Sequence, residues 1–138
     1  MTSRADIHAF LTENRHGVIA TNASSGAPES AVVGFAATLA LELVFDTLDT
    51  TRKIANIRRD PNVSAVIGWD DDGTLQYEGV ADEPTGEDLE RVRSVYFEAF
   101  PDGPERLKWT GITYVRIRPS WLRFTSYTQP DRNVEMVF

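Results

Sequence analysis

Apolar residues recur at every second position in several short stretches of this chain, and this period constrains the fold more than any other feature. Alternation places successive side chains on opposite faces of a strand. The stretches with this period cover residues 17–23, 29–38, 41–47, 63–69, 74–81, 112–118 and 121–127. Short loops between consecutive strands favour antiparallel pairing. The sequence therefore predicts a mainly antiparallel sheet of six to seven strands.

Three segments with helical spacing interrupt the strands. They cover residues 3–14, a stretch from Asp49 or Thr50 to Asp60, and residues 85–100. Each has apolar residues three or four positions apart, which is typical of one buried helical face. Helices this sparse exclude a doubly wound parallel sheet. We therefore expect one α+β domain, residues 1–138, built on a small closed or partly closed barrel.

Composition excludes several classes of function. The 138 residues include no cysteine and only two histidines, which argues against disulfides, thiolate nucleophiles and a metal site. The formal net charge of -7 argues against a nucleic-acid partner. No apolar run approaches the roughly 20 residues of a membrane span, and no signal-peptide core follows the N-terminus. We expect a cytoplasmic protein that does not bind a membrane.

One cationic segment interrupts this acidic sequence. Residues 50–59 contain four cations and no acid. Arg52 and Lys53 fall in the first turn of the predicted helix, where backbone N–H groups lack partners and the helix dipole is positive. Cations there do not stabilise the helix itself, but they would complement a bound anion such as phosphate. The residues leave open a second interpretation, a solvated basic turn paired with Asp46, Asp49 or Asp60.

No side chain is tied to a catalytic set by its spacing. His16 lies at a helix-to-strand junction, where a structural histidine is more common than a ligand or a base. Asp70–Asp72 is predicted to be a solvated turn. The sequence therefore assigns no catalytic residue, and the catalytic residues are unknown.

Three motifs occur in a fixed order along the chain. They are residues 45–63, FDTLDTTRKIANIRRDPNV, residues 78–81, EGVA, and residues 118–124, RPSWLRF. The motif of residues 45–63 is similar to the phosphate-binding turn and helix of the pyridoxamine 5′-phosphate oxidase-like FMN-binding split-barrel family. The second is similar to the family's strand ending in Glu-Gly-x-Ala, and the third resembles its last two strands. The resemblance covers about residues 3–127.

The resemblance implies a split β-barrel with about three peripheral helices. It also implies a homodimer with FMN at the subunit interface and a small-molecule substrate. By this resemblance, the FMN phosphate would be held by Arg52 and Lys53, with hydroxyls from Thr51 and Thr47. The flavin ring would lie along the second strand and meet a further set of side chains. The positions implied for the ring are Val32, Val33, Gly34, Trp69, Thr74 and Gln76.

The chain departs from pyridoxamine phosphate oxidases proper at three places. Their second-strand arginine has no counterpart in residues 29–31, Thr74 stands where they carry glutamine, and no histidine follows His16 to match their substrate-binding Arg-x-His pair. We therefore expect an FMN-binding oxidoreductase with an unknown substrate. Two alternatives stay open, a deazaflavin-dependent reductase on the same scaffold and a non-catalytic flavin-binding module. Heme, used by another relative, is disfavoured by the scarcity of histidine.

Overall fold

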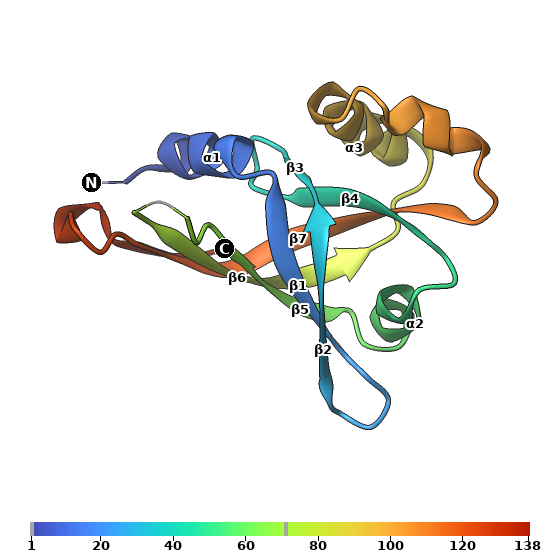
Figure 1. Cartoon of the computed structure of the whole chain (residues 1–138), viewed down its shortest axis with the longest axis horizontal. Coiled ribbons are helices and arrows are strands. Elements are labelled where there is room, and N and C mark those ends of the chain that lie inside the picture. Colours follow the sequence, from blue (N-terminus) through green and yellow to red (C-terminus); the bar gives the residue numbers. More distant parts are fainter. Residues whose placement is uncertain (1, 71) are drawn as a thin grey trace.

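Among residues 2–70 and 72–138, which the computed structural model describes, eight strands form one curled antiparallel sheet (Figure 1). The strands are β1 (His16–Asn22), β2 (Pro28–Gly34), β3 (Ala36–Ala37), β4 (Leu43–Leu48), β5 (Asn62–Ile67), β6 (Thr74–Asp82), β7 (Ile112–Thr125) and β8 (Val134–Val137). Their order across the sheet is β2-β1-β5-β6-β7-β4-β3, and β8 pairs with the second half of β7. The curl produces a half-barrel, which confirms the expected split-barrel architecture.

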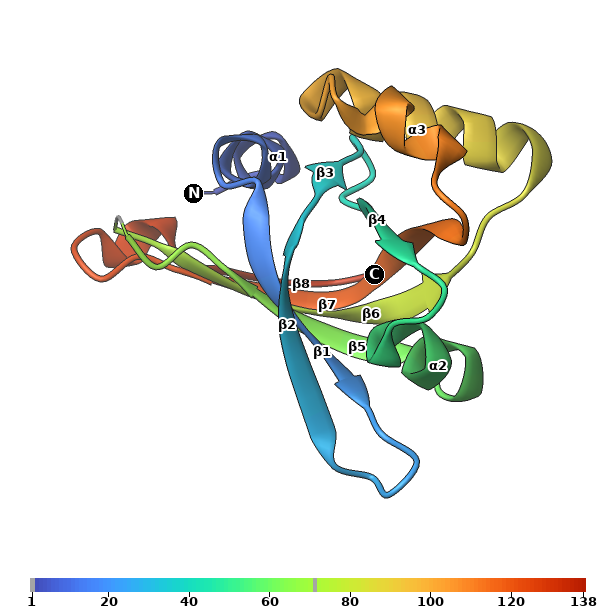
Figure 2. The same ribbon diagram turned by 45° about the vertical axis from the view of Figure 1, so that its right-hand side comes forward.

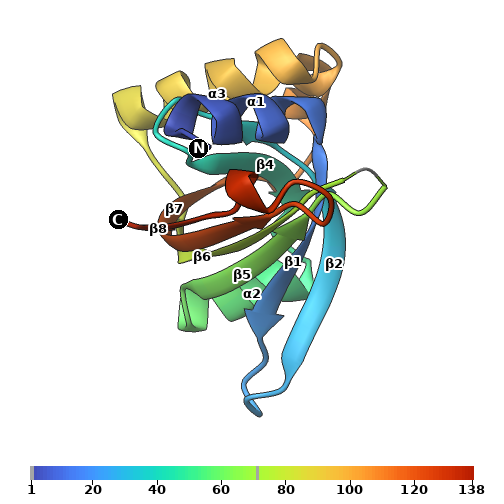
Figure 3. The ribbon, with the colours of Figure 1, turned by 90° about the vertical axis from the view of Figure 1, so that its left-hand side faces the viewer.

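Three α-helices lie around this sheet: α1 (Arg4–Glu13), α2 (Arg52–Arg59) and α3 (Gly86–Ala99). Two 3-10 turns complete the described part of the chain, η1 (Gly103–Lys108) and η2 (Pro130–Arg132). Helices α1 and α3 cover one end of the half-barrel, and α2 lies at the other end beside β1 and β5 (Figures 2 and 3). No helix of the described residues is long and apolar enough to cross a membrane.

The last two predicted strands are one continuous strand, β7. A bulge at Ser120 replaces the expected break, because Glu78 pairs with Trp121 while Gly79 pairs with Pro119. The Ser120 hydroxyl donates to the Glu78 carbonyl oxygen at 3.1 Å. Proline lacks an N–H group and is tolerated in a sheet at such bulges. The predicted second strand is in turn divided into β2 and β3, and the tail adds β8, so the strand count exceeds the six to seven expected.

Alternation along β6 and β7 separates a core face from an outer face. Leu75, Tyr77 and Leu122 point into the core and are almost completely buried. Trp121, next to Leu122, lies half-exposed on the outer face. The core therefore fills the inside of the half-barrel, and the outer face of the sheet carries its own set of side chains.

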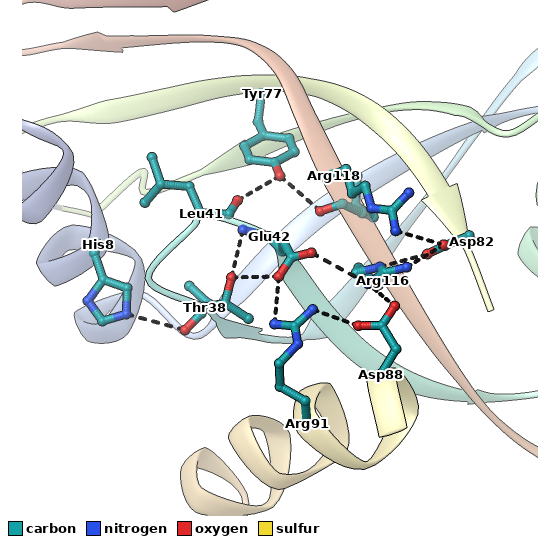
Figure 4. Close-up of polar contacts among 12 residues, drawn as sticks. His8, Thr38, Leu41, Glu42, Tyr77, Asp82, Asp88, Arg91, Arg116 and Arg118 are labelled. Atoms are coloured by element: carbon teal, nitrogen blue, oxygen red, sulfur yellow. Dashed lines mark hydrogen bonds and ion pairs between the residues drawn. The ribbon is translucent and has the colours of Figure 1, made fainter. Parts of the chain in front are cut away.

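An ionic network around the buried Arg116 ties α3 to the sheet (Figure 4). Arg116 of β7 donates to both carboxylate oxygens of Asp82, at 2.9 and 2.6 Å, and to Asp88 of α3 at 2.6 Å. Arg91 of α3 donates to Asp88 at 2.9 Å and to Glu42 at 3.0 Å. The Arg116 side chain is only 3% exposed, so these carboxylates compensate a charge removed from water. The network fixes the N-terminal half of α3 over β4 and β7.

Asp72 does not have the solvated-turn role expected of it. Its carboxylate accepts hydrogen bonds from the hydroxyls of Ser126 and Thr128, and from the backbone N–H groups of Tyr127 at 2.7 Å and Thr128 at 3.0 Å. The Ser126 and then the Thr128 hydroxyl bonds lower the pKa of Asp72 to about 2. Asp72 thereby anchors the segment that leads into β8. Asp71, the middle residue of the predicted turn, lies outside the described residues.

Candidate functional site

The first turn of α2 faces β1 and β2 across a cavity of about 360 Å³, called here the α2 cavity. Its lining residues come from three segments: Thr50, Thr51, Arg52 and Lys53 from the start of α2, Ile19 and Thr21 from β1, and Glu29, Ser30 and Ala31 from β2. The predicted cationic pair therefore lies at a hollow and not on a flat surface.

Helix α2 is positioned by one buried side. Ile54 and Ile57 pack in the core, and Asn56 is buried between them. The Asn56 amide donates to the Thr21 hydroxyl at 3.0 Å and to Glu29 at 2.8 Å. Asn56 therefore links the helix to both neighbouring strands. A polar residue inside an apolar helical stripe was a usable sequence signal for this role, but the sequence-based site did not include it.

Lys53 is a half-buried cation without an ion-pair partner among the described residues. No hydrogen bond or ion pair joins its ammonium group to any residue of the described chain, 2–70 and 72–138. Burial lowers the pKa of Lys53. Removing a charge from water without a partner costs free energy, and a bound anion would recover it. Lys53 therefore places a positive charge, unpaired among the described residues, at the α2 cavity.

Arg52 has a different environment from Lys53. Its Nη1 donates to Glu29 Oε2 at 2.6 Å, and its side chain stays 74% exposed while that of Glu29 is 21% exposed. The predicted alternative, a basic turn paired with Asp46, Asp49 or Asp60, is wrong about the partners. Asp46 pairs with Arg106 of η1 at 2.6 Å instead. The ion-pair partner of Arg52 comes from β2, which the local sequence around Arg52 does not reveal.

The two predicted threonines, Thr47 and Thr51, form side-chain hydrogen bonds within their own segment. The Thr51 hydroxyl donates to the Leu48 carbonyl oxygen at 3.0 Å, and its oxygen lies 3.3 Å from the Thr47 hydroxyl oxygen. Thr51 is the N-cap residue of α2, yet its side chain caps no backbone N–H group. The N–H groups of the first helical turn therefore have no helical acceptor and face the cavity end of α2. Thr51 lines the cavity, whereas Thr47 lies behind it on β4.

The three predicted β2 positions have three different environments. Val32 is exposed on the outer face of the sheet, whereas the side chains of Glu29 and Ala31 lie on the other face of β2. Val33 points into the core and is buried, which leaves only its backbone to a ligand. A Cβ atom at Gly34 would lie 3.0 Å from the ring of Phe100, so the missing side chain makes room for that ring.

The remaining predicted residues, Trp69, Thr74 and Gln76, do not line the α2 cavity with Lys53 in a single chain. Gln76 lines a second hollow of about 420 Å³ on the outer face, with Val18, Val66 and Trp121 among its other walls. Trp69 is exposed, Thr74 is half-buried, and neither lines the α2 cavity. Ser30 belongs to the walls of both hollows, so the two are neighbours across β2.

Comparisons with known proteins agree with this architecture. A family model described as pyridoxamine 5′-phosphate oxidase matches residues 3–126. No curated protein matches the chain.

Solved structures share the fold. A heme-binding protein from Mycobacterium smegmatis superposes with a TM-score of 0.83 at 19% identity, over 99% of this chain and 59% of that one. A conserved hypothetical protein from Mycobacterium tuberculosis gives 0.75 at 27% identity, over 91% and 86% of the two chains. A heme storage protein from Vibrio cholerae gives 0.74 at 18% identity, over 86% and 91%. The chain thus spans under two thirds of the M. smegmatis protein, and its likeness to the two heme proteins is one of fold alone.

Proposed function

The chain belongs to the pyridoxamine 5′-phosphate oxidase family, and on this premise we propose that it binds FMN and acts as an oxidoreductase on a small-molecule substrate. The observation that carries the proposal is Lys53, a half-buried cation without a partner among the described residues, in a cavity at the N-terminus of a helix. Helix N-termini and cations together favour phosphate groups.

The donors around the α2 cavity fit a phosphate monoester. Lys53 supplies a point charge, Arg52 a forked guanidinium, and the first turn of α2 supplies backbone N–H groups. A volume of about 360 Å³ is at the small end of ligand sites and holds only part of a dinucleotide-sized or flavin-sized molecule. The flavin ring would therefore extend from the α2 cavity along β2.

The protein and the cofactor have separate roles in this proposal. Bound FMN supplies reversible electron or hydride transfer. The chain binds the phosphate through Lys53 and Arg52, and Asn56 fixes the helix that carries both. No acid or base of the described residues lines the α2 cavity besides Glu29, Arg52 and Lys53, so we assign no proton transfer to this chain.

A second copy of the chain would complete the site. Val32 of β2, Val66 of β5 and Val80 of β6 are exposed on the outer face of the sheet, and Trp121 lies half-exposed on the same face. Apolar side chains concentrated on one sheet face are typical of a surface covered by a partner. We propose a homodimer through this face, in which Trp69, Thr74 and Gln76 of one copy approach the FMN held by the other.

Titration with flavins tests the proposal. The purified protein is titrated with FMN and with riboflavin, which has the same ring and no phosphate, while flavin fluorescence is recorded. We expect FMN to bind more tightly than riboflavin. Equal affinity, or no binding of FMN, would contradict the phosphate site. The absorption spectrum of the protein's extracted cofactor separates FMN from a deazaflavin, and reduction by NADH or NADPH in stopped flow separates an enzyme from a binding module.

Heme is the second candidate, because two structures with this fold are described as heme proteins. The histidines give it little support. His8 Nε2 lies 3.3 Å from the Ala37 carbonyl oxygen, and His16 is an exposed residue at the start of β1. A Soret band on addition of heme, lost in His16→Ala, would favour heme over flavin.

A further inference from the structure

We propose that Glu29 is a built-in competitor for the phosphate, because its carboxylate occupies the anion position beside Arg52. This inference rests on the proposed function, since it concerns the same α2 cavity. A phosphorylated ligand would have to displace the carboxylate from Arg52, and the affinity of the cavity for phosphate is set by that exchange. Glu29 would thus determine how strongly this chain prefers a phosphorylated ligand over its dephosphorylated form.

Each oxygen of the Glu29 carboxylate has one donor. Oε2 accepts from Arg52 Nη1 at 2.6 Å, and Oε1 accepts from Asn56 Nδ2 at 2.8 Å. The donors come from the first and second turns of α2, and the acceptor comes from β2. A carboxylate and a phosphate present similar oxygens to such donors. Glu29 therefore mimics one edge of a phosphate inside the α2 cavity.

A second ion pair on α2 shows what a purely structural contact looks like there. Arg58 donates to Glu83 through Nε at 2.9 Å and through Nη2 at 2.8 Å, a two-point contact outside the α2 cavity. Arg52 gives Glu29 a single contact, and no other described residue accepts from its guanidinium. An exposed one-point ion pair stabilises a fold only weakly. The Arg52–Glu29 pair is consequently easy to exchange for a ligand.

Asn56 would become a phosphate donor once Glu29 has moved. Its amide nitrogen has two hydrogens, of which one goes to the Thr21 hydroxyl and the other to Glu29. Arg59 Nη2 donates to the Asn56 side-chain oxygen at 3.2 Å, which fixes the orientation of the amide. Displacement of Glu29 therefore leaves an oriented N–H group directed at the place of the Glu29 carboxylate, which belongs to the wall of the cavity that Lys53 also lines.

The test compares Glu29→Gln with a matched control, Glu83→Gln, which removes the carboxylate of the other α2 ion pair. Glutamine at position 29 keeps an oxygen that accepts from Asn56, so the fold is expected to persist. We expect Glu29→Gln to bind FMN about tenfold more tightly than the native chain, since a carboxylate next to a bound anion is lost. Riboflavin affinity should stay unchanged in both variants, and FMN affinity should stay unchanged in Glu83→Gln.

Each outcome decides between the two proposals. Equal or weaker FMN binding by Glu29→Gln overturns the role of Glu29 and leaves the proposed function standing. Absence of FMN binding in every folded variant overturns the proposed function.

In that case inorganic phosphate is titrated while the backbone amide signals of Arg52 and Lys53 are followed by NMR. Tighter phosphate binding in Glu29→Gln then supports the inference, and equal or absent binding overturns it. Glu29→Ala replaces Glu29→Gln if circular dichroism shows the latter to be unfolded.

Discussion

The phenol of Tyr77 donates a hydrogen bond to the carbonyl oxygen of Leu41 at 2.8 Å, beneath the turn that joins β3 to β4 (Figure 4). Leu41 is completely buried and has a φ of 64°, a conformation that residues with a side chain rarely adopt. Burial raises the pKa of Tyr77, so the phenol keeps its proton and remains a donor. The Tyr77 hydroxyl therefore supports the strained turn from inside the barrel, in addition to the hydrogen bonds between Thr38 and Glu42 within the turn.

Tyr77→Phe should destabilise the fold without changing the packing of the ring. The substitution removes the single proton that the phenol shares between the carbonyl oxygens of Leu41 at 2.8 Å and Ile117 at 3.1 Å, and the loss of this buried donor costs about 1–3 kcal/mol. Urea unfolding monitored by circular dichroism measures the change. Tyr127→Phe is the control, because the Tyr127 side chain is exposed. Equal midpoints for the two variants would show that the hydroxyl does not hold the turn.

Arg116→Ala should be among the most destabilising changes of a charged residue in this chain. It leaves Asp82 and Asp88, whose side chains are 39% and 42% exposed, without their buried cationic partner. Loss of hydrogen bonds to a charged group costs about 1.5–3 kcal/mol. Arg118→Ala is a matched control, since Arg118 is exposed and lies 3.8 Å from the same Asp82. Thermal unfolding of both variants measures the difference. A similar loss in both would mean that the network contributes no more than a surface ion pair.

Arg52→Ala should weaken FMN binding and leave the fold intact. A hydrogen bond to a charged group is worth about 1.5–3 kcal/mol, which corresponds to about tenfold to a hundredfold in affinity. Riboflavin binding should be indifferent to the change. Arg58→Ala is the appropriate control from the same helix, because Arg58 pairs with Glu83 away from the cavity. Arg59 is unsuitable as a control, since its guanidinium contacts Asn56. If Arg52→Ala and Arg58→Ala bind FMN alike, the phosphate lies elsewhere.

Asp72 should make the C-terminal segment sensitive to acid. Its pKa of about 2 in the folded chain lies below the ordinary value of 3.8, so the carboxylate stabilises the fold fully above about pH 4. That contribution falls as the pH drops toward 2, because the carboxyl becomes protonated. The protection factors of the Tyr127 and Thr128 amides, which are exchange rates corrected for the intrinsic rate at each pH, should therefore fall over this window in the native chain. Asp72→Asn should give low protection factors at every pH, whereas Asp70→Asn should behave as the native chain does.

The proposed dimer predicts that one charge on the outer face will separate the subunits. Val66→Glu places a carboxylate on β5 among the exposed apolar side chains, where burial against a partner would be costly. Sedimentation equilibrium should give a dimer for the native chain and a 15.4 kDa species for the variant. Leu39→Glu, at an exposed leucine on the β3–β4 turn, should remain dimeric. A native chain of 15.4 kDa would remove the basis for a shared flavin site.

Local patterns predicted the elements well because alternation and helical spacing act within a few residues. Leu75 and Tyr77 point inward as the alternation of their strand requires. The helix expected over residues 3–14 forms as α1, and Ser3 and Asp6 make a capping box at its start. The break expected at Pro119 did not occur, because a bulge opposite Glu78 absorbs the proline. Whether a proline ends a strand or sits in a bulge depends on the neighbouring strand, which local sequence does not specify.

Residues of the candidate site were likewise predicted where local sequence determines their position, and missed where distant contacts do. Arg52 and Lys53 were placed at a helix N-terminus by the residues around them, and they line the cavity there. Glu29 was noted only as a departure from the family, because its contact with Arg52 spans 23 positions and depends on β2 lying beside α2. Asp72 was misassigned for the same reason, since its partners lie 54 to 56 positions away.

Strand β7 has a consequence for how the chain folds during synthesis. It pairs with β6, β4 and β8, and Leu43 of β4 meets Ile117 of β7 across more than half the length of the chain. While a nascent chain lacks residues 112–125, β4 has no long partner and β6 presents an open edge. Such edges recruit other chains, and contacts this distant form slowly. The period before β7 leaves the ribosome is therefore when this protein most needs protection by a chaperone.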